Sequence, residues 1–230
     1  MEPPTAFDYG RLYEYRFRDV NQAQRQMVWN VISRHIHQAM GSPDIVLDPA
    51  AGRCEFLNAV PARERWGIDI AEHSEFRDPA IKMIVGDALT VEIPSAYFGG
   101  VFVSNFLEHL PTQEHVARLL VRLRQSMRAG GSIAVLGPNF RYSVREYFDC
   151  ADHTLALTHI AVAEHLYSAG FTVGEIRPKF LPYSFRSHLP ASRSLTEAYL
   201  KFPPAWHLLG RQFLVLAQVP SKGDDSSEPA

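Results

Sequence analysis

The sequence lacks the features that mark several large classes of protein. It has two cysteines, Cys54 and Cys150, among 230 residues, which are too few for a disulfide framework and fit reduced thiols. A formal net charge of -2 gives no general attraction to nucleic acid or to an anionic membrane surface. No apolar run approaches the roughly 20 residues that cross a bilayer, and the amino terminus does not resemble a signal peptide. We therefore expect a globular, cytoplasmic protein that binds neither nucleic acid nor membrane.

Short apolar runs alternate with amphipathic stretches along most of the chain. The apolar runs predict strands near residues 44–47, 66–70, 81–85, 101–104, 132–136, 171–176 and 212–219. Helical spacing predicts helices near residues 21–40, 111–128 and 158–169, with Thr112 and Thr158 as N-caps. Such alternation is typical of parallel strands joined by crossovers, and the last two strands are expected to form an antiparallel edge. The sequence therefore predicts one α/β domain over residues 21–220.

Three segments are predicted to differ from this regular pattern. Residues 1–20 contain tyrosines and arginines without a clear period, so we expect an irregular amino-terminal arm. Residues 179–209 hold several prolines and aromatics and are long for a plain connection, which predicts a lid or an oligomer contact and leaves a homodimer open. Residues 221–230 are polar and are expected to be disordered.

An acid and a turn of small residues follow the first predicted strand. Asp48 ends this strand, and Ala50 and Gly52 lie in the turn before the next helix. Such a turn lets a ligand approach the backbone, and the helix start offers free N–H groups. The glycine fingerprint of dinucleotide enzymes and the Lys-Ser/Thr of a phosphate loop are both absent. Because a carboxylate attracts a cation and repels a pyrophosphate, Asp48 favours a cationic ligand.

Two more acids follow the next two strands. Asp69, in Gly67-Ile68-Asp69, lies about 20 residues after the turn, where an acid typically accepts both hydroxyls of a ribose. Asp87, in Gly86-Asp87-Ala88, can accept a hydrogen bond from the amino group of an adenine. A cationic adenosine compound with these contacts is S-adenosylmethionine, which we expect as the cofactor. Each acid also has a simpler interpretation as the cap of the following turn.

These motifs occur together with Val103 to Leu110 (Val-Ser-Asn-Phe-Leu-Glu-His-Leu) and Arg128-Ala129-Gly130-Gly131. In this order they resemble class I S-adenosylmethionine-dependent methyltransferases over roughly residues 25–178. The resemblance implies a Rossmann-like seven-stranded sheet of order 3-2-1-4-5-7-6, flanked by helices, with the last strand antiparallel. The cofactor-binding residues that we predict are Asp48, Ala50, Gly52, Asp69, Ile70, Asp87, Ala88, Asn105 and Phe106. Ala50 and Cys54 stand where family members commonly carry glycine, and both are small enough for binding to be retained.

Polar residues also gather after the fifth predicted strand, from residue 137 to residue 159. The segment resembles a subgroup of bacterial methyltransferases associated with polysaccharide and secondary-metabolite gene clusters, in which this loop faces the acceptor. The residues that we predict to act on the acceptor are His153 as the base, Asp152 to hold it, His109 as another base, and Asn139 and Tyr142 to orient the acceptor. His159 is a further candidate base, and each histidine also has a structural interpretation. The spacing of Cys150, His153, His159 and His165 matches no familiar zinc site, so we expect no metal.

The predicted reaction is methyl transfer from S-adenosylmethionine to a hydroxyl, or an amine, of a small molecule such as a sugar or a secondary metabolite. It needs in-line displacement with base assistance. The fourth strand is not followed by the Asn-Pro-Pro-Tyr motif of many amino-group methyltransferases, which disfavours nucleic-acid bases. Two alternatives remain open: a cyclase or lyase of the azetidine-2-carboxylate synthase type, which releases methylthioadenosine, and a non-catalytic cofactor-binding scaffold.

Overall fold

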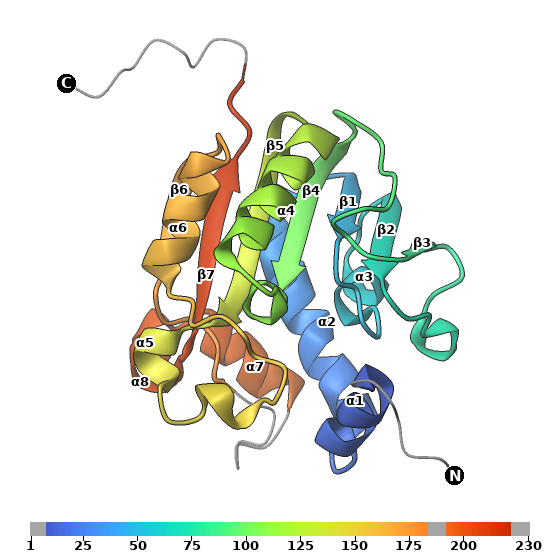
Figure 1. Cartoon of the computed structure of the whole chain (residues 1–230). Coiled ribbons are helices and arrows are strands. Elements are labelled where there is room, and N and C mark those ends of the chain that lie inside the picture. The colour runs from blue at the N-terminus through green and yellow to red at the C-terminus, as the bar shows by residue number, and fades with distance from the viewer. Residues whose placement is uncertain (1–7, 184–191, 222–230) are drawn as a thin grey trace, which may run out of the picture.

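The computed structural model describes residues 8–183 and 192–221. They form one twisted sheet with helices on both faces (Figure 1). The strands are β1 Ile45–Asp48, β2 Glu64–Asp69, β3 Lys82–Val85, β4 Phe98–Ser104, β5 Met127–Pro138, β6 Thr172–Arg177 and β7 Gln212–Gln218. The α-helices are α1 Tyr9–Phe17, α2 Gln22–Ala39, α3 Glu55–Ala59, α4 Gln113–Ser126, α5 Phe140–Ser143, α6 His159–Ser168, α7 Arg193–Leu200 and α8 Pro203–Leu209. The 3-10 turns are η1 Ser74–Phe76, η2 Leu107–His109 and η3 Tyr147–Asp149.

The strand order is β3-β2-β1-β4-β5-β7-β6, as the sequence predicts. The pairs from β3 to β5 are parallel, whereas β7 runs antiparallel to both β5 and β6. Because β7 lies between β5 and β6, the edge strand is β6. The order changes direction between β1 and β4, and in sheets of this kind ligands bind beyond the carboxyl ends of the strands at such a point.

Alternate residues of β4 serve two separate hydrophobic cores. Val101 and Val103 face α4 and α6 in one core, while Phe102 faces α2 and α3 in the other. All three side chains are fully buried. This arrangement follows from the two-residue period of a strand covered on both faces, and it fixes the positions of the strand ends.

The helix boundaries predicted from caps are confirmed. Thr112 and Thr158 accept hydrogen bonds from the backbone N–H groups of His115 and Ala161 at the starts of α4 and α6. Gly170, with φ +85°, follows α6 in the left-handed region.

The expectation of an irregular amino-terminal arm is wrong for residues 9–17, which form α1. Asp8 caps this helix by accepting a hydrogen bond from the N–H of Arg11. Tyr13, Arg16 and Phe17 are spaced by three and four residues, so they share one face of the helix. Arg16 on this face contacts Asp152, and Phe17 contacts Arg25. The spacing of these residues therefore reflects contacts with the rest of the domain.

Part of the segment 179–209 belongs to the domain. Leu200 in α7 is buried in the same core as α2, and Tyr199 packs against this core. Residues 184–191 lie outside the described part of the chain, as do residues 222–230 of the tail expected to be disordered. A lid or interface role for residues 179–209 stays a prediction. None of the helices in the described ranges is long and apolar enough to span a membrane.

Candidate active site

Asp48 lies at the carboxyl end of β1 and is almost wholly buried, with 4% of its surface exposed. Its Oδ1 accepts a hydrogen bond from the N–H of Ala50 at 3.1 Å. Burial raises the pKa of Asp48 to about 8, and the nearby carboxylate of Asp69 adds to the shift. A buried acid of this kind favours a cation beside it, because a positive charge offsets the cost of ionisation.

The turn after β1 leaves open space beside its backbone at Gly52. Gly52 has φ +49°, and a Cβ at this position would meet no described atom within 4 Å. The backbone at Gly52 therefore borders open space, which fits a ligand lying against the turn. Ala50 has no positive φ, as its side chain requires.

Cys54 precedes α3 and departs from the simple expectation of a small helix-opening residue. Its φ is +58°, a left-handed conformation that costs a non-glycine residue on the order of 1 kcal/mol. The side chain is buried, and burial raises the pKa of its thiol to about 12. Cys54 is therefore a packing residue held in a conformation that glycine adopts more easily.

Asp69 and Ile70 stand at the end of β2. The two carboxylate oxygens of Asp69 accept hydrogen bonds from the N–H groups of Gly52, at 2.8 Å, and Ala71, at 3.0 Å. Each oxygen retains a second lone pair, so the carboxylate is able to accept two further hydroxyl donors. The neighbouring Ile70 is 61% exposed, which leaves an apolar surface beside this acid.

Asp87 and Ala88 follow β3. Asp87 is exposed, and its Oδ1 accepts a hydrogen bond from the N–H of Leu89 at 2.8 Å, which caps the turn. Its Oδ2 has no hydrogen bond to any described residue, so this oxygen can accept one from an adenine. Ala88 is buried in the core beneath. The two predicted roles of Asp87, in the turn and toward a ligand, are compatible.

Asn105 and Phe106 follow β4. Asn105 is exposed and adopts φ +48°, a conformation that asparagine tolerates better than most residues. Its side chain donates a hydrogen bond to the Oγ of Ser104. Phe106 packs against the core beside β4. Asn105 therefore faces outward from the switch between β1 and β4, and Phe106 supports it.

The loop after β5 is tied to the turn after β4 by a dense set of hydrogen bonds. The carbonyl oxygen of Glu108 accepts from the N–H groups of Thr154, at 2.9 Å, and Leu155, at 3.2 Å. The Oγ1 of Thr154 also donates to the carbonyl oxygen of Leu110 at 2.6 Å. These contacts bring Glu108 and His109 against the loop that carries Asp152 and His153, although about 45 residues separate the two segments.

Asp152 does not hold His153 as predicted, because its carboxylate contacts Arg16 and His109. Arg16 donates two hydrogen bonds to this carboxylate, one of them from Nη1 at 3.2 Å. Nδ1 of His109 lies 3.4 Å from Oδ2 of Asp152. Burial acts to raise the pKa of Asp152, but the hydrogen bonds from Arg16 and the charge of His109 lower it overall. Asp152 is thus an ionised acid that connects α1 to His109.

His153 is enclosed by other rings. Its ring centroid lies 4.9 Å from that of His109 and 4.8 Å from that of Tyr147. Burial, aided by His109, lowers the pKa of His153 to about 4. His153 is therefore neutral near pH 7, with a ring able to accept a proton or a ligand.

Asn139 and Tyr142 take different positions in the loop. Asn139 is fully buried, and its amide donates to the carbonyl oxygen of Pro178 at 2.8 Å and contacts Nδ1 of His159 at 2.9 Å. These contacts give Asn139 a positioning role. Tyr142 stacks on the His159 ring, with the Lys179 ammonium over its own ring. Their predicted contacts with an acceptor stay predictions.

Sequence reasoning missed Tyr13 and Arg16 as site residues. The pKa of Tyr13 is raised, chiefly by burial and next by the charge of Asp152. The charge of Asp69 adds to this shift. Tyr13 therefore lies near both the acid after β2 and the acid in the acceptor loop. Figure 1 places α1 at the end toward which β4 points. The spacing of these residues on one helical face was the signal available in the sequence.

The candidate zinc set is not assembled. Cys150 lies near Tyr183, and His165 pairs with Gln113. Within residues 8–183 and 192–221, the metal-competent group of side chains is instead Glu108, His109 and His153. A separate cavity of about 380 Å³ lies between α2 and α7, and its lining comes from these helices and not from the strand ends.

Comparisons with known proteins agree with this architecture. Residues 47–135 match a family described as "Methyltransferase domain". No curated protein matches the chain. Among solved structures, the chain is similar to an S-adenosylmethionine-dependent methyltransferase from Archaeoglobus fulgidus, with 21% identity, a TM-score of 0.65, and coverage of 92% of this chain and 100% of that one.

Two further solved structures with the same fold carry different descriptions. A complex between the Trm112 methyltransferase activator and a methyltransferase of Haloferax volcanii matches at 14% identity and a TM-score of 0.67, over 94% of this chain and 100% of that one. The [4+2]-cyclase SpnF matches at 13% identity and a TM-score of 0.58, over 84% of this chain and 81% of that one. The family match and the fold together support S-adenosylmethionine as the cofactor. Residues 47–135 therefore match the methyltransferase-domain family, and the described chain has the fold of class I S-adenosylmethionine-dependent methyltransferases.

Proposed function

We propose that the protein transfers a methyl group from S-adenosylmethionine to a hydroxyl or an amine of a small molecule such as a sugar or a secondary metabolite. The observation that carries the proposal is the set of acids Asp48, Asp69 and Asp87 at the carboxyl ends of β1, β2 and β3. These strands are adjacent in the sheet, so the three acids lie along one edge. A cationic adenosine compound satisfies all three.

The residues at this edge fit the cofactor. The spare lone pairs of the Asp69 carboxylate suit the two ribose hydroxyls, and the exposed side chain of Ile70 offers an apolar contact for the adenine. The open backbone at Gly52 lets the ligand approach closely. Asp48 attracts the ammonium end, because its burial makes it a strong partner for a cation. When bound, S-adenosylmethionine supplies the methyl group on its sulfonium.

We assign α1 and the loop after β5 to the acceptor. They exclude water from the site and receive the proton that an acceptor hydroxyl loses. Tyr13 of α1 lies near Asp69 and Asp152, and the ion pair between Arg16 and Asp152 holds α1 beside the site. The ring of His153, with that of His109 beside it, is the proton acceptor that we propose for a hydroxyl. An in-line approach of the acceptor oxygen is then the main requirement.

The experiment is a transfer assay with the purified full chain and S-adenosylmethionine that carries a labelled methyl group. A panel of sugars, phenols and small amines is tested, and products are identified by mass. The proposal predicts an acceptor that gains one methyl group together with S-adenosylhomocysteine in equal amount. Retention of activity by Asp69→Ala at limiting cofactor concentration would argue against the proposed binding mode.

A cyclase is the second candidate, because SpnF shares the fold and is named for a cyclisation. Incubation with S-adenosylmethionine alone separates the two. Methylthioadenosine formed without any acceptor would support intramolecular cyclisation, whereas S-adenosylhomocysteine that forms only with an acceptor supports transfer. Binding of S-adenosylhomocysteine in calorimetry, with neither product formed from S-adenosylmethionine, would leave the cofactor-binding scaffold.

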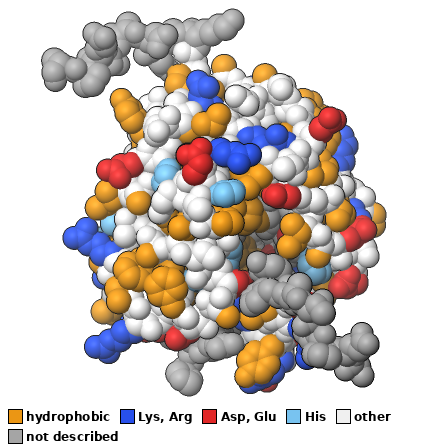
Figure 2. Space-filling model, viewed as in Figure 1, with side chains coloured by type: hydrophobic (Ala, Val, Ile, Leu, Met, Phe, Trp, Pro, Cys, Tyr) orange, Lys and Arg blue, Asp and Glu red, His pale blue; other side chains and the backbone are white. Residues whose placement is uncertain are grey.

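We also propose that the protein acts in the cytoplasm and forms a homodimer. Figure 2 shows hydrophobic side chains gathered near α5. Val144, directly after α5, and Phe148, in η3, are both exposed. Such side chains suit a contact with another protein. The complex of the Haloferax volcanii methyltransferase with an activator shows that one protein of this fold binds a protein partner.

A further inference from the structure

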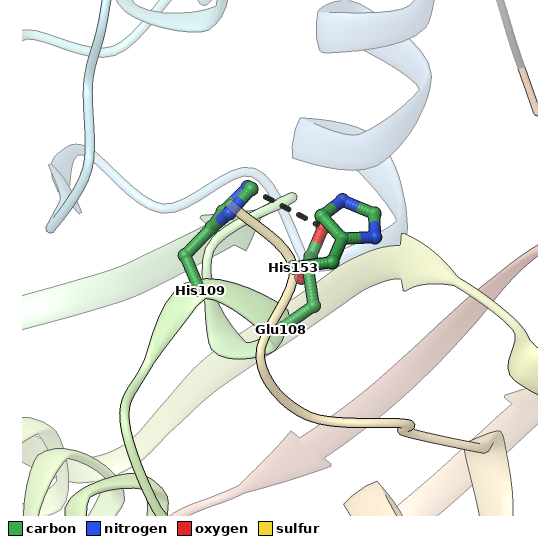
Figure 3. Close-up of side chains that lie close together, drawn as sticks. All are labelled: Glu108, His109 and His153. Carbon is green, nitrogen blue, oxygen red and sulfur yellow. Dashed lines mark ion pairs between the residues drawn. The ribbon is translucent and has the colours of Figure 1, made fainter. Parts of the chain in front are cut away.

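We propose that Glu108, His109 and His153 form a binding site for one divalent transition-metal ion, of the Zn²⁺, Mn²⁺ or Co²⁺ type. One ligand atom from each of the three side chains lies within 4.8 Å of the others. Figure 3 shows the three side chains converging from two separate segments of the chain. The sequence gives no familiar metal spacing, because Glu108 and His109 follow β4 whereas His153 comes from the loop after β5.

Glu108 carries the strongest evidence for a missing partner. The residue is only 2% exposed, yet its Oε1 has no hydrogen-bond partner among the described residues. Nε2 of His109, at 4.0 Å, is too far to form a hydrogen bond. An unpaired buried carboxylate oxygen costs several kcal/mol unless a water, a proton or an ion satisfies it.

His109 is oriented as a metal ligand. Its Nδ1 lies 3.0 Å from the carbonyl oxygen of Asp152. A carbonyl oxygen only accepts, so Nδ1 carries the proton and Nε2 presents its lone pair on the side of Glu108. A hydrogen bond from the far nitrogen to a carbonyl or a carboxylate is the usual second contact of a metal-bound histidine.

His153 completes the set. Its Nδ1 is buried and also lacks a hydrogen-bond partner within residues 8–183 and 192–221. Two imidazoles and one carboxylate are ligands that Zn²⁺, Mn²⁺ and Co²⁺ share, whereas Mg²⁺ and Ca²⁺ prefer oxygen alone. A tetrahedral zinc ion with bonds of about 2.1 Å holds its ligand atoms about 3.4 Å apart. The side chains therefore close by little more than about 1 Å on binding.

The backbone around the cluster is already fixed. The carbonyl oxygen of Glu108 accepts hydrogen bonds from Thr154 and Leu155, so the two segments that supply the ligands are joined. A prebuilt frame lowers the entropic cost of gathering three ligands. With three protein ligands, a cation retains open positions, which is the pattern of catalytic and not of structural zinc sites.

If the proposed methyl transfer is correct, an open position suits an oxygen of the acceptor. A hydroxyl bound to the cation would lose its proton to solvent water more readily, and the two histidines would serve as ligands while the cation is bound. This consequence depends on the proposed function, but binding of the cation does not.

Cation binding is tested with the full chain after treatment with EDTA and dialysis. Titration with CoCl₂ is followed by visible absorption, and titrations with ZnCl₂ and MnCl₂ are followed by calorimetry. We expect one site per chain, and an affinity at least about tenfold lower in Glu108→Gln, His109→Ala and His153→Ala. His165→Ala is the matched control, because His165 is paired with Gln113 outside the cluster, and it should bind like wild type.

Glu108→Gln keeps the shape of the side chain, so the test survives if a histidine variant does not fold. Absence of a stoichiometric site in wild type, or equal affinity in wild type and Glu108→Gln, would overturn the proposal. Binding of S-adenosylhomocysteine, measured on the same samples without metal, reports separately on the proposed function. A cation site without methyl transfer would refute only that function, and methyl transfer by a wild-type chain that binds none of the three cations would refute only this site.

Discussion

At the residue scale, the buried acid Asp48 at the end of β1 is costly to ionise in the protein without its ligand. Asp48 has a pKa of about 8 in the folded chain and an ordinary value of 3.8. Its contribution to stability is therefore fully present below pH 3.8 and is lost as the pH rises toward 8, because the unfolded chain ionises first. Asp48 therefore stays protonated at neutral pH in the protein without cofactor, and it ionises when a cation binds beside it. Cofactor binding is thus linked to the release of a proton.

We predict that binding of S-adenosylhomocysteine at pH 7 releases up to one proton from Asp48. Calorimetry in two buffers with different ionisation enthalpies measures this number. Asp48→Asn should release fewer protons and bind more weakly, because it has no charge to offer the ammonium.

Chemical unfolding of the unliganded proteins is the control. Relative to wild type, Asp48→Asn should gain up to about 1.4 kcal/mol of unfolding free energy per pH unit between pH 5 and pH 8. A stability difference that does not change with pH would contradict the shifted pKa of Asp48.

Asp69→Ala should weaken the binding of S-adenosylhomocysteine by about 1.5 to 3 kcal/mol, because charged hydrogen bonds to the ribose are lost. Calorimetry measures the change. The matched control is Asp78→Ala, since Asp78 also accepts a backbone hydrogen bond, from Ala80, but precedes β3 at the other end of the sheet. Equal losses in the two variants would show that the effect is structural.

At the element scale, α1 is held to the domain by side-chain contacts that include an ion pair and two cation–π contacts. Arg16 pairs with Asp152, whose side chain is only 2% exposed, and Phe17 lies under the guanidinium groups of Arg25 and Arg53. A helix of this length has little stability of its own, so these contacts keep it folded.

Arg16→Gln should release α1, because it leaves the buried Asp152 carboxylate without its charged partner. We expect amide hydrogen exchange in residues 9–17 to become about tenfold faster or more, with exchange in α4 unchanged. Arg18→Gln is the control, because Arg18 pairs with Asp19 at the surface. Unchanged exchange in the Arg16 variant would rule out this ion pair as the attachment of α1.

Gly100 in the central strand β4 has no room for a side chain. A Cβ on Gly100 in β4 would lie 2.4 Å from Cγ of Pro43, whereas a Cβ on Gly174 in the edge strand β6 would lie 3.4 Å from its nearest atom. Gly100→Ala should therefore cost about 1 to 3 kcal/mol in unfolding free energy, and Gly174→Ala should cost much less. Urea unfolding compares them, and equal effects would contradict the close contact with Pro43.

At the scale of the whole molecule, cofactor binding and stability are linked. A ligand at 100 times its dissociation constant adds about 2.7 kcal/mol to the unfolding free energy. For a chain of this size, that corresponds to a rise in Tm of about 5 to 10 °C. We predict such a rise with S-adenosylhomocysteine in wild type and a smaller rise in Asp69→Ala at the same concentration. No rise in wild type would contradict a cofactor site.

The sequence predicted the parts of the fold that depend on local pattern. Strand and helix positions follow from hydrophobic period and caps such as Thr112 and Thr158. The order of the strands followed from a resemblance in motif order, and the cofactor followed from the three acids after the strands. The acids Asp48 and Asp69 were found because each directly follows a strand, and parallel strands bring such positions to one edge.

Only the tertiary structure decided which distant side chains meet. The pairing of Asp152 with Arg16, in place of His153, joins residues that are 136 positions apart. The convergence of Glu108 and His109 with His153 likewise depends on hydrogen bonds between two loops. A local pattern contains no information on such contacts, because they depend on how the completed sheet orients its loops. The sequence by itself determined the sheet and the acids at its edge, and the packing of the loops and α1 onto that edge determined the rest of the site.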